Sequence, residues 1–339
     1  MSNPLLTPAE IDGLAPADLP SYRIDRYQAE DERTSLSDFA AGDAAQLRSL
    51  YATLLALFER LKPVYGDPLL CLEAILRYLK EEDWSAFVGP LRQLGKETLA
   101  RPGTDRLRRV LHDLRGGAFQ SLSLRLQLME IAEPRPEDAQ QAFFLVRDHL
   151  KIMRNCVADL DLERYAADSS RQDHAIGLLA EKWTKAPFCG EDHRATVDVL
   201  CRYAGVICES CLEFSTLDRI IYNLMNNAAR FTADGRVLLA MVPTPSVENP
   251  ENVRFVIANR IAPEHASTLR DRFGDRVDEL LRGGFTTGGN GLGLRICADF
   301  CAQAYGLADF DTARDGGYFG ARLQDDLFLV WFHWPTAGD

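Results

Sequence analysis

The chain has 339 residues, of which 46% are hydrophobic and 26% charged, and its formal net charge is −12. This composition predicts a folded protein with one large or two to three ordinary cores, and the negative charge disfavours direct binding to nucleic acid. No apolar run is long enough to span a membrane and no secretion signal stands at the start, so we expect a cytoplasmic protein.

The first third of the chain is expected to be helical. Residues 1–35 contain four prolines among polar residues, which is typical of an irregular lead-in. Apolar residues then recur at helical spacing over 44–62, 69–79 and 84–99, without strand-like alternation. This pattern argues against a mixed α/β sensor domain here, and it does not reveal a ligand or partner.

A helical hairpin is predicted next. After a break at 101–103, one helix spans about 104–132, and a second follows the turn at 134–136. The second helix carries an apolar seam with spacings of three and four, formed by Phe143, Val146, Leu150, Met153, Val157 and Leu160. One hairpin cannot bury this seam, so we expect a second copy to complete a four-helix bundle, as a homodimer. The competing arrangement packs the hairpin against the N-terminal helices of its own chain.

His112 and Asp113 lie in the first hairpin helix, with His112 one step off its apolar face. A neutral imidazole is a good nucleophile near pH 7, and the neighbouring carboxylate can fix its tautomer and withdraw the proton as the ring attacks a phosphoryl group. The pair therefore predicts a phosphate acceptor, with an ordinary polar surface pair as the alternative. Gly116 and Gly117 each weaken the helix by about 1 kcal/mol relative to alanine, which predicts a bend just beyond His112.

From about residue 166 the pattern becomes that of a sheet covered by helices. Helical stretches alternate with strand-like runs, the helices over 217–231 and 292–305 and the strands over 236–242, 253–258, 318–323 and 327–334. We therefore predict an α/β sandwich with helices on one face of a mixed sheet.

The chain also contains eight cysteines, which we expect to be free thiols. Cys208 and Cys211 have the Cys-x-x-Cys spacing of a redox or metal site, with Cys189 and Cys201 upstream as possible further ligands. The simpler interpretation is that these cysteines are small buried residues.

Two motifs in the last third are typical of nucleotide binding. On a helix, Asn223, Asn227 and Arg230 share one face. An amide oxygen can complete the coordination of a Mg²⁺ ion that also holds phosphate oxygens, and a guanidinium can neutralise the phosphates. The second motif is the loop FTTGGNGLGL at 285–294, whose glycines leave backbone N–H groups free to approach a phosphate at the start of the next helix.

Together with the His112 segment, these motifs resemble the H box, N box and second glycine box of the histidine kinases of two-component signalling, over roughly residues 104–336. The resemblance implies an α+β protein in three parts. These are a helical N-terminal region at 1–100, a dimerisation and phosphotransfer hairpin at 101–165, and an α/β sandwich of the histidine-kinase-type ATPase fold at 166–339.

The resemblance also implies roles for single residues in binding ATP. Asn227 would hold Mg²⁺, while Asn223 and Arg230 would line the triphosphate. The hinge of the lid over the nucleotide would be formed by Gly289, Gly291 and Gly293.

His112 would then accept the γ-phosphoryl group, with Asp113 as its base, and pass it to an aspartate on the receiver domain of a response regulator. Three functions follow from the motifs. The first is an autophosphorylating kinase, the second a phosphotransfer protein whose nucleotide domain has decayed, and the third a pseudokinase that regulates a true kinase.

Two departures from the family pattern bear on these alternatives. Asn259 stands where the family has the aspartate that accepts the adenine amino group, and no glycines follow it. Losing that charge-assisted hydrogen bond costs about 1 to 2 kcal/mol, or roughly tenfold in affinity. Gly116 replaces the residue that usually positions water, which puts phosphatase activity in doubt.

Overall fold

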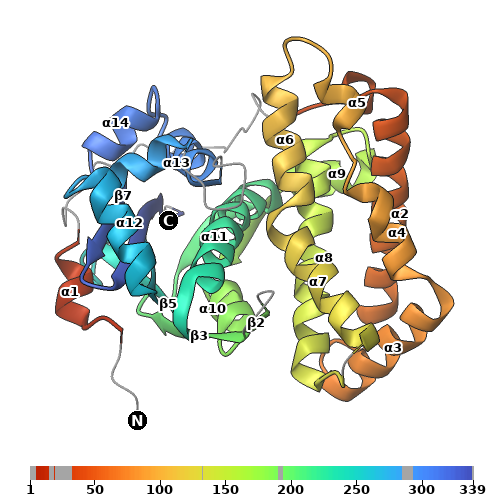
Figure 1. The fold of residues 1–339 in the computed structure, drawn as a ribbon, viewed down its shortest axis with the longest axis horizontal. Coiled ribbons are helices and arrows are strands. Elements are labelled where there is room, and N and C mark those ends of the chain that lie inside the picture. The colour runs from red at the N-terminus through yellow and green to blue at the C-terminus, as the bar shows by residue number, and fades with distance from the viewer. Residues whose placement is uncertain are drawn as a thin grey trace. The chain divides into compact units, whose positions relative to one another are not determined.

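The computed structural model describes residues 5–14, 19, 33–131, 133–189, 194–284 and 293–337. Contacts divide the chain into two compact units (Figure 1). One is a helical unit formed by residues 29–170, and the other is an α/β unit formed by residues 171–339 together with residues 1–28. The α+β class predicted from the sequence is confirmed, while the three-part functional division stays a prediction.

The helical unit confirms the all-helical prediction for this part of the chain. The short 3-10 helix η2 covers Leu36–Asp38, and the α-helices are α2 (Ala41–Leu61), α3 (Pro68–Glu81), α4 (Trp84–Leu91), α5 (Lys96–Leu99), α6 (Asp105–Arg115), α7 (Gly117–Ile131), α8 (Pro136–Cys156) and α9 (Leu162–Ser169).

The apolar seam of α8 is buried within its own chain. Helix α8 packs against α2, α3 and α7, and every predicted seam residue except the half-buried Leu160 is buried. The competing arrangement is therefore the one observed, because α2 and α3 supply the second helical pair that a partner copy was expected to bring. A homodimer stays a prediction that this seam no longer supports.

The hairpin helix predicted over 104–132 is divided into α6 and α7, as the two glycines led us to expect. A Cβ atom on Gly116 would lie 2.7 Å from the carbonyl oxygen of His112, too close for any other residue. Gly117 has a φ of 48°, in the left-handed region that favours glycine. The bend just beyond His112 is thus confirmed and requires both glycines.

The α/β unit contains a six-stranded sheet in the order β2-β3-β5-β6-β8-β7, in which β3 and β5 are parallel and the other pairs antiparallel. The strands are β2 (Pro187–Cys189), β3 (Arg194–Cys201), β5 (Thr232–Pro245), β6 (Pro250–Ile261), β7 (Phe319–Gln324) and β8 (Leu327–Pro335). The four predicted strands correspond to the last four of these.

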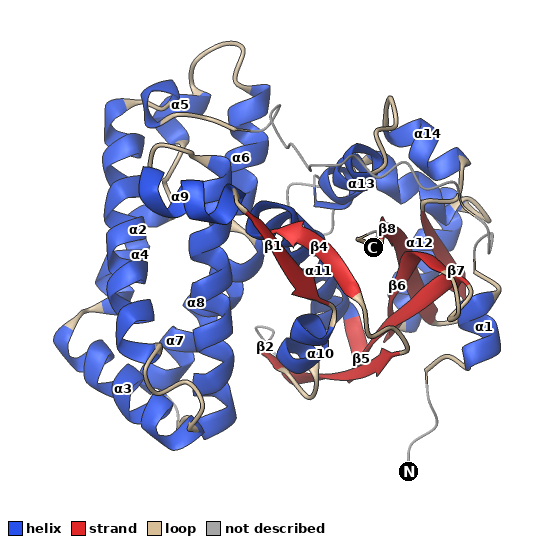
Figure 2. Cartoon of the chain, turned by 180° about the vertical axis from the view of Figure 1, so that it is seen from behind, coloured by secondary structure: helices blue, strands red, loops and turns tan. Residues whose placement is uncertain are grey.

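A separate two-stranded sheet, which the sequence analysis missed, pairs β1 (Arg171–Ala175) with β4 (Val206–Ser210) (Figure 2). Strand β1 is exposed at four of its five residues, so it has no apolar alternation to detect. The helices of this unit are α1 (Pro8–Asp12), α10 (Gly177–Trp183), α11 (Cys211–Phe231), α12 (Pro263–Phe273), the 3-10 helix η3 (Val277–Arg282), α13 (Gly293–Ala304) and α14 (Phe310–Asp315).

Both faces of the large sheet are covered. Helices α11 and α13 pack together and against strands of one face, which confirms the predicted sandwich. The other face is covered by the start of the chain, where Leu5, Leu6, Ile11 and Leu14 form a core with β5, β6 and β8. The lead-in predicted to be irregular therefore contains a short helix, α1, that begins with a capping box between Thr7 and Glu10. No described helix combines the length and the apolar character needed to cross a membrane.

The core of the helical unit contains an imidazole that makes stability depend on pH. His149 is fully buried against Phe119, with ring centroids 5.2 Å apart, and neither ring nitrogen has a hydrogen-bond partner among the described residues. Burial lowers the pKa of His149 to about 3, and the Asp113 carboxylate only partly opposes this effect. The folded state therefore holds the ring neutral, whereas the unfolded chain takes up a proton below about pH 6.5.

We predict that His149→Phe stabilises the protein and reduces the loss of stability on acidification. In the natural protein, the free energy of unfolding is unaffected by the titration of His149 above about pH 6.5. Between pH 6.5 and 3 this free energy falls by up to about 1.4 kcal/mol per pH unit, because only the unfolded chain can protonate the ring. Urea unfolding of both proteins between pH 7.5 and 5 measures the difference. Parallel pH profiles for the variant and the natural protein would show that His149 does not titrate in this way.

Candidate functional site

His112 and Asp113 form a hydrogen-bonded pair on the last turn of α6. The distance between His112 Nδ1 and Asp113 Oδ1 is 3.2 Å, and the side chains are 18% and 2% exposed. A carboxylate at neutral pH only accepts hydrogen bonds, so Nδ1 carries the hydrogen and Nε2 keeps its lone pair. The pair predicted from the sequence thus has the geometry of an oriented nucleophile rather than that of two solvated side chains.

The backbone around this pair is held by close packing between α5 and α6. Arg115 donates hydrogen bonds to the carbonyl oxygens of Leu111 and Leu94, at 3.3 and 3.0 Å, and its partial burial lowers the pKa of the guanidinium. At Gly95, a Cβ atom would lie 2.4 Å from a methyl group of Leu111. The turn that carries His112 is therefore held by contacts with the segment just before α5.

Helix α11 presents the three polar residues of the asparagine motif, Asn223, Asn227 and Arg230, in a gradient of exposure. Asn223 is buried, with 8% of its surface exposed, Asn227 is partly exposed and Arg230 is exposed. Spacings of four and three place them on one face. Exposure therefore increases along this face from the packed middle of the helix toward its C-terminal end.

Helix α11 is anchored firmly enough to keep this face in place. The Arg219 guanidinium stacks over the ring of Phe300 in α13, 4.1 Å from its centroid. Asp218 forms a fully buried ion pair with Lys182 of α10. A buried charge needs such a partner, because desolvation of an unpaired one is expensive.

Asn259 lies on β6, opposite Val237 of β5 and Phe328 of β8. Its neighbour Ala258 belongs to the core beneath the N-terminal segment, so the alternation of strand residues directs Asn259 to the face covered by α11. The side chain is 2% exposed, and its Nδ2 donates to the carbonyl oxygen of Arg260 at 3.3 Å. Helix α12 begins four residues later, at Pro263, where the family resemblance led us to look for glycines.

An aromatic pair that the sequence analysis did not anticipate lies at the end of α11. The rings of Phe231 and His265 stack with centroids 4.7 Å apart and an interplanar angle of 10°. Phe231 packs on an apolar cluster between β6, α12 and η3 that includes Ile261 and Phe328. Burial lowers the pKa of His265, which keeps its ring neutral against Phe231.

The glycine motif is described only at its end. Gly289 and Gly291 lie outside the described residues, and Gly293 is the first residue of α13. Because α11 packs against both β6 and α13, the α/β unit brings together the elements that carry Asn223, Asn227, Arg230, Asn259 and Gly293. His112 and Asp113 belong to the helical unit.

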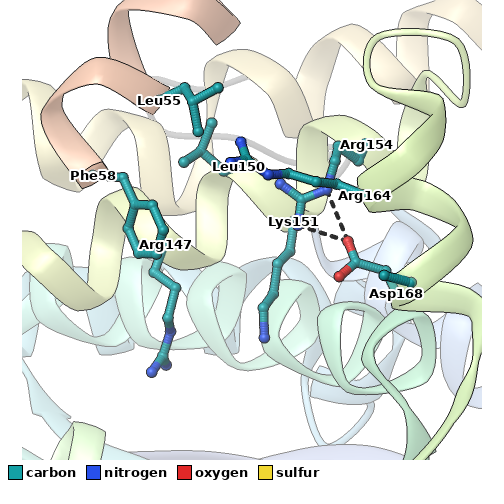
Figure 3. Close-up of a pocket in the computed structure, with 9 residues that line it drawn as sticks. Leu55, Phe58, Arg147, Leu150, Lys151, Arg154, Arg164 and Asp168 are labelled. Atoms are coloured by element: carbon teal, nitrogen blue, oxygen red, sulfur yellow. Dashed lines mark hydrogen bonds and ion pairs between the residues drawn. The ribbon is translucent and has the colours of Figure 1, made fainter. Parts of the chain in front are cut away.

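A cavity in the helical unit was considered as a second candidate site. It lies between α2, α8 and α9 and is lined by four cationic side chains, those of Arg147, Lys151, Arg154 and Arg164 (Figure 3). Three of these cations bind carboxylates of the same unit: Arg147 binds Asp148, Arg154 binds Asp168, and Arg164 binds Glu59 and Asp161. The charges are thus largely compensated within the protein, and the cavity does not have the excess charge expected of a phosphate site.

The hydrogen bond to Asp113 predicts which nitrogen of His112 carries the proton. We expect the ¹⁵N chemical shifts of the neutral ring to show a protonated Nδ1 and an unprotonated Nε2, because only Nδ1 faces the carboxylate. In Asp113→Ala the two tautomers should become mixed, as in a free imidazole. A dominant Nε2–H tautomer in the natural protein would contradict the assignment of Nε2 as the nucleophile.

No family model and no curated protein matches this chain. Among solved structures, 54 chains match. The mycobacterial sensor histidine kinase MprB is 17% identical, with a TM-score of 0.28, over 42% of this chain and 84% of that chain. Acinetobacter baumannii histidine kinase AdeS is 14% identical, with a TM-score of 0.29, over 67% of this chain and 98% of that chain.

Full-length ShkA in complex with AMPPNP is 18% identical, with a TM-score of 0.30, over 69% of this chain and 45% of that chain. In structure, then, the chain is similar to sensor histidine kinases.

Proposed function

We propose that this protein is a histidine kinase that transfers the γ-phosphoryl group of ATP to Nε2 of His112 and then to an aspartate on the receiver domain of a response regulator. The observation that carries the proposal is the 3.2 Å hydrogen bond between His112 and Asp113, combined with the partial exposure of His112. A buried carboxylate that holds a partly exposed imidazole by one nitrogen leaves the other nitrogen ready to react.

ATP would bind in the α/β unit. The residues on α11 fit Mg²⁺ and a triphosphate, because amide oxygens at Asn223 and Asn227 are followed by the exposed cation Arg230 at the open end of the helix. When bound at Asn227, Mg²⁺ would neutralise phosphate charge and leave the γ-phosphorus open to attack. The segment around Gly289, Gly291 and Gly293 would supply backbone N–H groups to the phosphates.

The reaction would proceed by in-line displacement. The lone pair of Nε2 forms a bond to the γ-phosphorus while the bond from that phosphorus to the bridging oxygen breaks, and ADP leaves. The ring acquires positive charge, and Asp113 accepts the Nδ1 proton to neutralise it. Transfer to a receiver reverses the proton movement, as an aspartate oxygen replaces the imidazole on phosphorus. The formal net charge of the protein is −12, which disfavours binding to nucleic acid. We therefore propose a cytoplasmic kinase whose partner is a protein.

The second candidate function is that of a phosphotransfer relay that no longer binds ATP. Two observations favour it. Asn259 is an uncharged and nearly inaccessible substitute for the expected carboxylate, with α12 following directly. The flat face of Phe231, close to the same strand end, is already covered by His265 of the protein itself. In this case His112 would receive its phosphoryl group from another phosphoprotein.

Incubation of the full chain with γ-labelled ATP and magnesium tests the proposal. We expect acid-labile label on the protein and none on His112→Ala. In Asn227→Ala self-labelling should be lost, because Mg²⁺ binding is impaired, while transfer from a phosphorylated receiver domain back to His112 stays intact. Equal loss of both reactions in Asn227→Ala would contradict the division of roles, and back-transfer without self-labelling in the natural protein would select the relay.

The Asn259→Asp variant tests the adenine-side assignment. A carboxylate accepts the adenine amino hydrogen more strongly than an amide does, so we expect ATP to bind roughly tenfold more tightly. Calorimetric titration with a non-hydrolysable ATP analogue and magnesium measures the change, with Asn249→Asp in an exposed loop as the matched control. Unchanged binding in Asn259→Asp, or the same gain in the control, would show that Asn259 does not contact the base.

A further inference from the structure

A cysteine and a histidine are in direct contact at the start of α11. Cys211 Sγ lies 3.2 Å from His174 Nε2, and His174 Nδ1 lies 2.6 Å from the backbone carbonyl oxygen of Gln172. A carbonyl oxygen only accepts hydrogen bonds, so Nδ1 carries the hydrogen and Nε2 presents its lone pair to the thiol. The S–H group of Cys211 therefore donates to Nε2, and the imidazole is oriented to take the thiol proton.

The fold fixes the ring of His174 in this orientation. Strand β1 pairs with β4 so that His174 lies opposite Cys208, and the ring stacks on Phe214 of α11 with centroids 4.9 Å apart. The side-chain oxygen of Gln172 is also within reach of Sγ, but at 3.9 Å it is the much weaker acceptor. The shortest path for the thiol proton thus leads to His174.

The position of Cys211 in its helix favours a thiolate. Cys211 is the first residue of the 21-residue helix α11, so it lies at the positive end of the helix dipole. Of the nearby carboxylates, Glu209 forms an ion pair with Arg171 at 2.9 Å, whereas Glu213 accepts hydrogen bonds from the uncharged N–H groups of Glu209 and Trp334.

The surroundings of His174 also contain a buried ion pair. The Nζ atom of Lys182 lies 5.7 Å from the centroid of the Phe214 ring, and its charge is paired with Asp218. This ion pair adds little net charge around the Cys211 thiol. The helix terminus and the His174 imidazole are therefore the groups that favour a thiolate.

Other cysteines of the chain have different surroundings. Cys71 donates to the backbone oxygen of Ala139, and burial raises the pKa of its thiol to about 11. Cys301 is fully buried beside two carbonyl oxygens, and its pKa is raised to about 12. Burial also raises the pKa of Cys201. A carbonyl oxygen cannot remove the proton from a thiol whose pKa is raised by burial. Cys71, Cys201 and Cys301 are therefore unreactive packing residues.

We propose that Cys211 and His174 form a reactive thiol site for small peroxides, with His174 as the base. Cys211 is 9% exposed, which admits a reagent of a few atoms. His174 Nε2 takes the thiol proton, Sγ forms a bond to one oxygen of the peroxide, and the O–O bond breaks. With hydrogen peroxide, the leaving hydroxide takes the proton from Nε2 and becomes water. The sulfur is oxidised to a sulfenic acid and the peroxide is reduced.

Alkylation of the full-length protein by iodoacetamide, followed site by site by peptide mass spectrometry, tests the activated thiol. We expect Cys211 to react about tenfold or more faster than Cys71 and Cys301, with a rate that changes little between pH 6 and 8. His174→Gln should slow Cys211 by about tenfold at pH 6.5 and make the rate rise steeply with pH, as for a free thiol. Cys208→Ser, three residues away in the same motif, is the matched control and should leave the rate unchanged.

The peroxide step has its own readout. Hydrogen peroxide followed by dimedone should label Cys211 in the natural protein and not in His174→Gln. If the alkylation rate of Cys211 in the natural protein rises with pH as it does for a free thiol, the proposal is overturned. This result needs no variant, so it holds even if His174→Gln does not fold. Rapid alkylation without a dimedone adduct overturns the peroxide assignment.

Discussion

The proposed chemistry depends on one hydrogen bond, from His112 Nδ1 to Asp113 Oδ1. It determines which nitrogen can react, because the buried carboxylate accepts a proton from only one side of the ring. The carboxylate in turn has to be held in the interior of a helical bundle, where an unpaired charge would be costly. The glycines after Arg115 allow this pair to end one helix rather than lie within a continuous one, since a Cβ on Gly116 would clash with the carbonyl of His112.

The bundle around the pair is completed within a single chain. Helices α2 and α3 cover the seam of α8 that a second copy was expected to cover. The first third of the chain therefore stabilises the helical unit by packing against α8. Helix α8 also carries His149, whose ring is buried in the same unit and is influenced by the Asp113 carboxylate.

Much of the fold was predictable because its signals are local. Strands β5 to β8 contain strand-like apolar runs, α11 has its apolar and polar faces at helical spacing, and the paired glycines predict the bend after α6. The remaining features depend on contacts between distant residues. Apolar spacing shows that α8 has a buried face but not which helices cover it. Leu6 and Ile11 look like part of a polar lead-in until the sheet beneath them is known.

The candidate site divides in the same way. His112, Asp113, Asn223, Asn227 and Arg230 could be found because motif spacing places them on helices. The stacking of His265 on Phe231 and the contact between His174 and Cys211 could not be found, since each joins residues far apart in sequence through strand pairing or core packing.

The central claim is that Nε2 of His112 is the phosphorylated atom. A ³¹P nuclear magnetic resonance spectrum of the protein after reaction with ATP and magnesium, at alkaline pH where phosphohistidine is stable, distinguishes the two ring positions. We expect a single phosphohistidine signal from Nε2 that is absent in His112→Ala. A signal from Nδ1, or a signal that persists in His112→Ala, would contradict it.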